Sequence, residues 1–314
     1  MKTIEFVVPL FNEEANISLF KASLDDVLNK TVLQCHYLIT FIDDGSSDNS
    51  WNEICQLAFL NMTVKGIRFS RNFGKEYAIE AGLKQSTADA VIVIDADLQH
   101  PISLVPKMIK AWQTGQYSVV SGIKAVRQKE SWLKSLAART YYFIFNKMSG
   151  LQLQQMTDFK LLDRNAIDAY LSLPEGSRFF RGLVFWLGYK EMKLEFTPLE
   201  RMHGASSWSF KQLYRYAKDS LISFSYIPLK LTSYLSLGML IFALLLTIQS
   251  LFNKFSGEAQ EGFTTVIIVQ LVIGCSIMFG LSNIGTYLAK IYDEIKSRPH
   301  YIISEKTARH GQAL

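Results

Sequence analysis

The sequence predicts an α/β domain with a mostly parallel sheet, followed by two transmembrane helices. Apolar strands alternate with helical segments at the spacing of βαβ units through residues 4–97. Each of these strands ends in polar residues, which is typical of sheets that bind ligands beyond the carboxyl ends of their strands. Two long segments without any charged residue, 231–253 and 263–289, then follow towards the C-terminus.

The first two strand–helix units follow from hydrophobic periodicity. Residues 3–8 are almost all apolar and stop at Pro9, which suits a buried parallel strand leading into a loop. Residues 13–29 place apolar side chains at helical spacing. A second strand runs to Ile42, and the serine-rich segment 46–50 is suited to cap a second helix.

The same arrangement repeats twice more. Residues 64–70 predict a third strand, 75–86 a third helix and 90–97 a fourth strand. Because the carboxyl ends of parallel strands meet at one edge, we expect a single pocket there. Its polar residues come in four pairs: Asn12 and Glu13, Asp43 and Asp44, Arg71 and Lys75, and Asp95 and Asp97. Neither GxGxxG nor GxxxxGK[ST] follows the first strand, so no dinucleotide site or P-loop is predicted.

The charge-free segments are each longer than the ~20 residues that cross a bilayer core. Two buried helices of a soluble bundle are the alternative. Basic residues flank the pair, whereas only Lys254 lies between them, so both ends are expected to face the cytoplasm. These flanking residues are Lys211, Arg215, Lys218, Lys230, Lys290, Lys296 and Arg298.

Charge, cysteine spacing and local patterns exclude several classes of function. A net charge of +5 gives no indication of nucleic-acid binding, and the first residues do not read as a secretory signal. Cys35, Cys55 and Cys275 have no CxxC spacing, so neither a disulfide framework nor a zinc site is expected. Residues 209–228 alternate aromatic and aliphatic positions with Lys and Arg, as an interfacial amphipathic helix does.

The expected organisation has four parts. It comprises a cytoplasmic catalytic domain at 1–208, the interfacial helix at 209–228, a two-span domain at 229–290 and a cytoplasmic tail at 291–314.

Several motifs resemble those of one enzyme family. VVPLFNEE, IDDGSSDNS, FSRNFGKEYAIEAGL and VIVIDADLQHP look like the successive motifs of family 2 glycosyltransferases. The match continues through TDFKLLDR, RFFRGLVFWLGY and RMHGASSWSFKQL. With two C-terminal spans, the chain resembles the polyprenyl-phosphate glycosyltransferases, such as bactoprenol glucosyltransferase and dolichol-phosphate-mannose synthase, over roughly residues 4–300. The resemblance implies the nucleotide-sugar-binding GT-A fold, which is Rossmann-like.

The resemblance also implies a metal site. Asp97 and Gln99 would bind Mg²⁺ or Mn²⁺, and Asp95 would lie between the metal and the nucleotide. Capping of the next helix is the alternative role for the two aspartates.

Nucleotide recognition falls to the earlier loops in this comparison. Pro9 and Phe11 would shape the base site, and Glu13 would accept a ribose hydroxyl. Either Asp43 or Asp44 would accept the uracil N–H, while the other forms a turn. For Arg71 and Lys75, a diphosphate contact and a solvated surface role are both open.

The acceptor and the reacting centre complete the expected site. Arg127, Ser131 and Arg139 match the positions that hold the lipid phosphate, the alternative being a basic helix on headgroups. Asp158 would orient a sugar hydroxyl, steer the acceptor or act as a base. Arg201 lies in a segment that resembles the loop closing over the diphosphate, with Gly204 as its hinge, and would stabilise the departing UDP.

The expected activity is the inverting transfer of a hexose from a UDP-sugar to undecaprenyl phosphate, with glucose as the first candidate. The product would serve later glycan or lipopolysaccharide modification at the bacterial inner membrane, and the family suggests a homo-oligomer. Transfer of amino-arabinose, N-acetylhexosamine or mannose is one alternative, and a non-catalytic membrane subunit is another. A processive synthase is disfavoured because no Q-x-x-R-W motif is present.

Overall fold

The computed structural model describes residues 2–31, 35–125, 156–176, 178–198, 227–256, 262–296 and 298–307. The chain divides into two compact units. One contains Met1–Trp208 together with Arg298–Leu314, and the other contains Ser209–Ser297.

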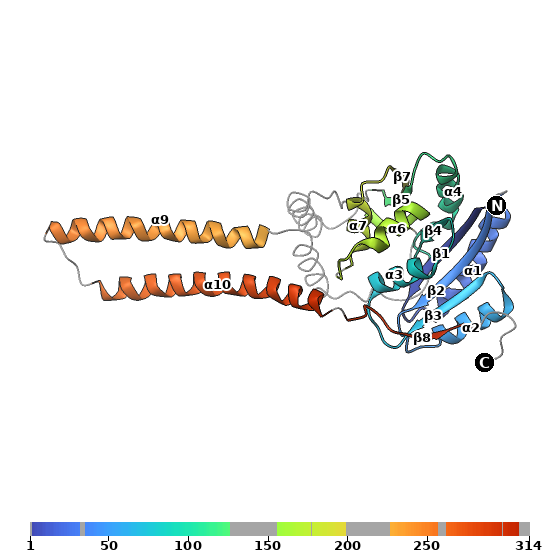
Figure 1. Ribbon diagram of the computed structural model, residues 1–314, viewed down its shortest axis with the longest axis horizontal. Coiled ribbons are helices and arrows are strands. Elements are labelled where there is room, and N and C mark those ends of the chain that lie inside the picture. The colour runs from blue at the N-terminus through green and yellow to red at the C-terminus, as the bar shows by residue number, and fades with distance from the viewer. Residues whose placement is uncertain are drawn as a thin grey trace. The chain divides into compact units, whose positions relative to one another are not determined.

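The first unit is built on an eight-stranded sheet of order β7-β5-β6-β4-β1-β2-β3-β8 (Figure 1). Four neighbouring pairs are parallel, β1 with β2, β1 with β4, β2 with β3 and β5 with β7. The predicted mostly parallel α/β sheet is therefore confirmed. Its strands are β1 (Lys2–Leu10), β2 (Cys35–Asp43), β3 (Val64–Phe69), β4 (Ala90–Val93), β5 (Val119–Lys124), β6 (Met156–Asp163), β7 (Glu191–Phe196) and β8 (Ile303–Lys306).

Helices cover both faces of this sheet. The core beneath α1, α2 and α4 includes alternate residues of β1, among them Phe6 and Val8, whereas α3, α6 and α7 pack on the opposite face. Because side chains on both faces of β1 are buried, its sequence is almost continuously apolar. The helices are α1 (Glu14–Asn29), α2 (Ser50–Leu60), α3 (Lys75–Gln85), α4 (Val105–Gln113), α6 (Arg164–Ser172) and α7 (Phe180–Trp186), with a short 3₁₀ turn at Ile102–Leu104.

The order of the central strands creates a switch point. From β1 the chain moves to β2 and β3, and then crosses back to place β4 on the other side of β1. Ligands of open α/β sheets bind at the carboxyl edge of such a point. β4 ends at Val93, so Asp95 and Asp97 lie in the loop after it rather than within the strand that the sequence predicts.

The second unit contains two long helices, α9 (Ile227–Phe255) and α10 (Phe263–Ile295), which pack on each other. Among the described residues, one stretch, Val269–Ala289 in α10, is long and apolar enough to cross a membrane. In α9 the apolar stretch is only Tyr234–Leu246. Ser and Thr residues and Gln249 interrupt the predicted first span, which is free of charge without being uniformly apolar.

The last described segment differs from the expected tail. After α10, residues 298–307 return to the first unit, where β8 pairs antiparallel with β3. Tyr301 stacks on Phe69 with ring centroids 4.9 Å apart, and Trp51 Nε1 donates a 3.0 Å hydrogen bond to Glu305. These contacts cover the edge strand of the sheet, and no local pattern in the sequence indicated them.

The close approach of α3 to the sheet depends on Gly82. A Cβ at this position would lie 2.3 Å from Val7 Cγ1 of β1. We expect Gly82→Ala to lower the free energy of unfolding by about 1–3 kcal/mol, because overpacking displaces the buried Val7 side chain. Thermal or denaturant unfolding of the detergent-solubilised chain measures this loss.

A double-mutant cycle provides the control. Val7→Ala removes the clashing methyl groups, so Gly82→Ala should cost less in the Val7→Ala background than in the native chain. Equal costs in both backgrounds would show that the contact between α3 and β1 is not what makes Gly82 necessary.

Candidate active site

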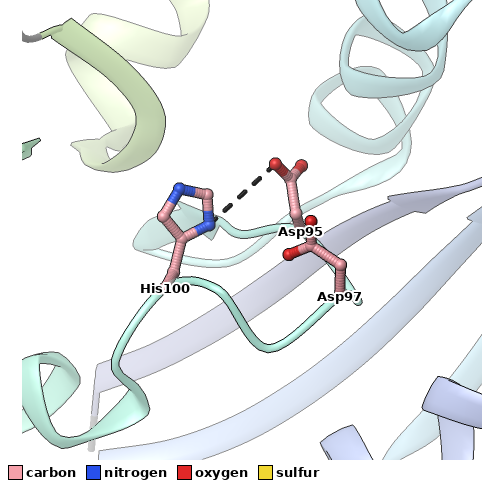
Figure 2. A group of neighbouring side chains, drawn as sticks. All are labelled: Asp95, Asp97 and His100. Carbon is pink, nitrogen blue, oxygen red and sulfur yellow. Dashed lines mark ion pairs between the residues drawn. The ribbon is translucent and has the colours of Figure 1, made fainter. Parts of the chain in front are cut away.

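Two carboxylates and an imidazole meet in the loop after β4 (Figure 2). Asp95, Asp97 and His100 each offer a ligand atom, and these atoms lie within 4.8 Å of one another. The chain reverses between them at Leu98, whose φ of 58° is rare for a leucine. Asp97 also accepts the backbone N–H of Gln99 at 3.1 Å, so the residues expected at the metal all belong to this one turn.

Lys75 joins this loop to β6. Its Nζ lies 2.6 Å from Asp95 Oδ1 and 2.8 Å from Asp158 Oδ2. Burial alone would lower the pKa of Lys75, but the Asp158 and Asp95 carboxylates raise it above its ordinary value. The ammonium is therefore fully charged at neutral pH and bridges the two carboxylates, while its side chain remains 40% exposed.

Asp158 is held by a second cation, Arg181 of α7. Arg181 Nε and Nη2 donate to the two oxygens of Asp158 at 2.6 and 2.8 Å. Burial would raise the pKa of Asp158, yet Arg181 and Lys75 together hold it well below its usual range. A carboxylate with such a low pKa is a poor proton acceptor, so this geometry suits orientation of a substrate better than general base catalysis.

The two aspartates at the end of β2 have different surroundings. Asp44 accepts the backbone N–H groups of Phe73 and Gly74 at 2.7 and 2.9 Å, although burial raises its pKa to about 6. Gly74 has a φ of 113°, and Lys75 follows it as the first residue of α3. Asp44 therefore fixes the loop that aims Lys75 at Asp95.

Asp43 is completely buried, and only one of its carboxylate oxygens accepts a hydrogen bond from a described residue. Its Oδ1 accepts the N–H of Ser46 at 2.9 Å. No hydrogen bond from a described residue reaches its Oδ2, and Arg68 Nε lies 3.5 Å away. Burial raises the pKa of Asp43.

The loop after β1 lies beside this pair. Pro9 is buried in β1, whereas Phe11, in the loop that follows, is 43% exposed. Glu13 donates its N–H to Ser50 Oγ and accepts a hydrogen bond from Asn16. Arg71 stacks its guanidinium on Phe73, with its Cζ 4.2 Å from the ring centroid, and is exposed.

Several expected residues lie outside the described part of the chain. Arg127, Ser131 and Arg139 fall within 126–155, and Arg201 and Gly204 fall within 199–226. The predicted interfacial helix at 209–228 lies outside it except for its last two residues.

Four residues of the site carried no assigned role in the sequence. Arg181 binds Asp158, and Glu76 lies near both of them. Glu76 also accepts the N–H of Phe180 at 2.8 Å. Lys124, at the end of β5, interacts electrostatically with Arg181, Asp95 and Asp97, and burial lowers its pKa. Burial likewise lowers the pKa of His100. Arg181 and His100 lie within the motifs RFFRGLVFWLGY and VIVIDADLQHP, but nothing local showed that their side chains turn towards the carboxylates.

The α/β fold, with charged side chains clustered at the carboxyl edge of its sheet, indicates an enzyme active site. The family model "Glycosyl transferase family 2" matches residues 5–170. The chain belongs to this family and is a glycosyltransferase. The family inferred from the motifs is thereby confirmed.

Individual relatives extend the match over almost the whole chain. The chain is 33% identical to the bactoprenol glucosyl transferase of Shigella phage SfX, over 96% of this chain and 99% of that protein. It is also 33% identical to the prophage bactoprenol glucosyl transferase homolog of Escherichia coli K12, over 96% and 98%. These relatives belong to the subgroup that the motifs indicated.

A solved structure supports the fold. The chain resembles glucosyl-3-phosphoglycerate synthase from Mycobacterium tuberculosis, crystallised with Mn²⁺, uridine diphosphate and phosphoglyceric acid. The TM-score is 0.51 at 20% identity, over 71% of this chain and 78% of that one.

Glu76 gives this site a measurable pH dependence. Burial and the nearby Asp158 raise its pKa to about 7, against about 4.3 in an unfolded chain. Between these values the folded state holds a proton that the unfolded state releases, so the free energy of unfolding falls as pH rises. We expect Glu76→Gln to remove this contribution, which amounts to about 1.4 kcal/mol for each unit of difference in pKa.

The measurement is denaturant unfolding of the native chain and the variant at pH 5, 6, 7 and 8. Glutamine keeps an oxygen that accepts the Phe180 N–H. Glu195→Gln, at an exposed position of β7, serves as the control. Parallel stability curves for the native chain and Glu76→Gln would contradict the assignment.

Proposed function

We propose that this glycosyltransferase transfers glucose from UDP-glucose to undecaprenyl phosphate, the lipid carrier also called bactoprenyl phosphate. The similarity to enzymes named bactoprenol glucosyl transferase, which spans 96% of the chain, carries the proposal. It includes the C-terminal helices as well as the catalytic domain, and therefore the part that a membrane-bound acceptor requires.

The donor would bind at the switch point between β1 and β4. Phe11 supplies an exposed ring for the base, and Asp43 is the better candidate for the uracil N–H because both oxygens of Asp44 bind backbone. Glu13 remains the proposed ribose contact. Lys75, which already pairs with Asp95, would also bind the diphosphate.

The residues of the β4 loop fit a divalent cation. Asp97, Gln99 and Asp95 supply the oxygen ligands that Mg²⁺ and Mn²⁺ accept, and buried His100 faces the same point. When bound, such an ion neutralises charge that develops on the leaving diphosphate.

The acceptor needs alignment more than activation. A phosphate monoester has a second pKa of about 6 and is largely dianionic at neutral pH. One of its oxygens would form a bond to C1 of glucose as the bond from C1 to the diphosphate oxygen breaks, and UDP leaves. This single displacement turns an α-linked donor into a β-linked glucosyl phosphate.

The ionised Asp158 would orient a glucose hydroxyl, with Lys75 and Arg181 keeping the carboxylate in place. The predicted roles of Arg127, Ser131 and Arg139 at the lipid phosphate, and of Arg201 at the departing UDP, remain part of the proposal.

The membrane arrangement is proposed on similar grounds. Val269–Ala289 would cross the inner membrane, and α9 would cross beside it, giving two spans with both ends and the catalytic domain in the cytoplasm. Large apolar side chains stand exposed along both helices, including Leu237, Leu244, Leu271, Ile277 and Leu288. In water such surfaces would be costly, whereas lipid or other copies of the chain would cover them. A homo-oligomer remains a prediction.

The function is tested by following radiolabel into lipid. In nanodiscs with undecaprenyl phosphate and Mg²⁺ or Mn²⁺, we expect label from UDP-glucose, and from no other UDP-sugar at a similar rate, to enter the lipid phase. Asp97→Asn should reduce this transfer at least about a hundredfold, because it removes a charge that the cation requires.

The matched control is Asp168→Asn on α6, whose side chain is 62% exposed and forms its ion pair with Arg164. It should transfer glucose at the native rate. Label entering lipid from a different UDP-sugar would correct the donor, whereas binding of UDP with no transfer from any donor would favour a non-catalytic subunit.

The pH profile of the reaction distinguishes a substrate-orienting role of Asp158 from a general-base role. Because the pKa of Asp158 is held well below its usual range, it does not titrate between pH 5 and 9. An acidic limb of kcat/KM in this window should therefore come from the acceptor phosphate near pH 6 and from Glu76 near pH 7. We expect Asp158→Asn to lower kcat by about a hundredfold or more without abolishing this limb. Disappearance of the limb in the variant would identify Asp158 as the base instead.

A further inference from the structure

His100 is held rigidly beside the two aspartates of the β4 loop. Its ring packs against Phe159 of β6, with centroids 5.2 Å apart, and against Phe196 of β7 at 5.6 Å. The side chain is only 7% exposed. The reversal of the chain at Leu98 brings the ring back towards the residues that precede it. Packing therefore fixes where the imidazole points.

The Nδ1 atom points at the acidic pair. It lies 3.9 Å from Asp95 Oδ2, while the other ring nitrogen is directed away from both carboxylates (Figure 2). The atom is buried, and no hydrogen bond from any residue that the structure describes reaches it. Buried polar atoms are almost always satisfied, so a nitrogen left in this position requires an explanation.

The spacing fits coordination better than a direct hydrogen bond. An N–H···O bond would bring the two atoms to about 2.9 Å, well inside the distance found here. Ligands placed about 2.0–2.2 Å from a common ion lie about 3–4.4 Å from one another. The ligand atoms of Asp95, Asp97 and His100, all within 4.8 Å, need to move little to surround one cation.

We propose that His100 Nδ1 is a protein ligand of the divalent cation, together with Asp97 and Asp95. This inference rests on the proposed function insofar as the cation is the one that accompanies the UDP-sugar. Its consequence is a preference for Mn²⁺ over Mg²⁺, because Mg²⁺ favours oxygen ligands and retains its waters, whereas transition metals accept imidazole readily. Phe159 and Phe196 act as supports that keep the ring in position.

The competing role for His100 is to orient Asp95 through a hydrogen bond once the side chains adjust. Electron spin-echo spectroscopy of Mn²⁺ separates the two, since a directly bound imidazole modulates the echo through its ¹⁴N nucleus and a more distant one does not. The experiment uses the full chain in detergent, with Mn²⁺ alone and with Mn²⁺ plus UDP. His100→Phe keeps an aromatic ring between its neighbours and removes the nitrogen.

We expect ¹⁴N modulation in the native chain, its loss in His100→Phe, and an Mn²⁺ dissociation constant raised at least about tenfold in that variant. The Mg²⁺ dissociation constant should change much less. His36→Phe, at an exposed position of β2, is the control and should keep both the modulation and the affinity.

Three results would overturn the inference: Mn²⁺ bound without ¹⁴N modulation in the native chain, native Mn²⁺ affinity in a folded His100→Phe chain, or no Mn²⁺ binding with or without UDP. Glucose transfer to undecaprenyl phosphate, measured on the same preparations, tests the proposed function separately. Transfer without a nitrogen signal defeats only the role of His100, whereas a nitrogen signal without transfer from any UDP-sugar defeats only the function.

Discussion

The site depends on the position of one ammonium group, that of Lys75 between Asp95 and Asp158. Carboxylates from the β4 loop and from β6 converge at one edge of the sheet, and buried like charges without a cation would be strongly destabilising. Asp44 fixes the backbone at Phe73 and Gly74, and so determines where Lys75 enters the site. Arg181 then completes the neutralisation of Asp158 from α7. Neutralisation of the buried carboxylates therefore depends on three separate elements: the end of β2, which positions Lys75, α3, which carries it, and α7, which carries Arg181.

Much of this arrangement was predictable because its signals are local. An apolar run that ends in polar residues indicates a buried parallel strand, and the structure has β1 to β4 at the predicted places. The shared position of these polar residues at one edge of the sheet follows from the parallel strands, whereas the contact of Lys75 with Asp95 and Asp158 was left open by the sequence. The family resemblance added Asp158, which hydrophobic periodicity would not have distinguished from any other strand residue.

The remainder could not be predicted because it depends on contacts between distant segments. Arg181 reaches Asp158 across 23 positions of sequence, and no spacing rule links a strand residue to a later helix in that way. The different roles of Asp43 and Asp44 arise from which carboxylate faces the β3–α3 loop. His100 reads as an ordinary loop residue until Phe159 and Phe196 are seen on either side of it.

The pairing of β8 with β3 has a consequence for biosynthesis. A ribosome delivers β3 before both long helices and β8 only after them, so the edge of β3 stays unpaired until α9 and α10 have been synthesised. During that interval its backbone N–H and C=O groups are open to pairing with other nascent strands. Closure of this edge is therefore tied to synthesis of both long helices, and a ribosome that stalls within α10 leaves a sheet whose β3 edge is still unpaired.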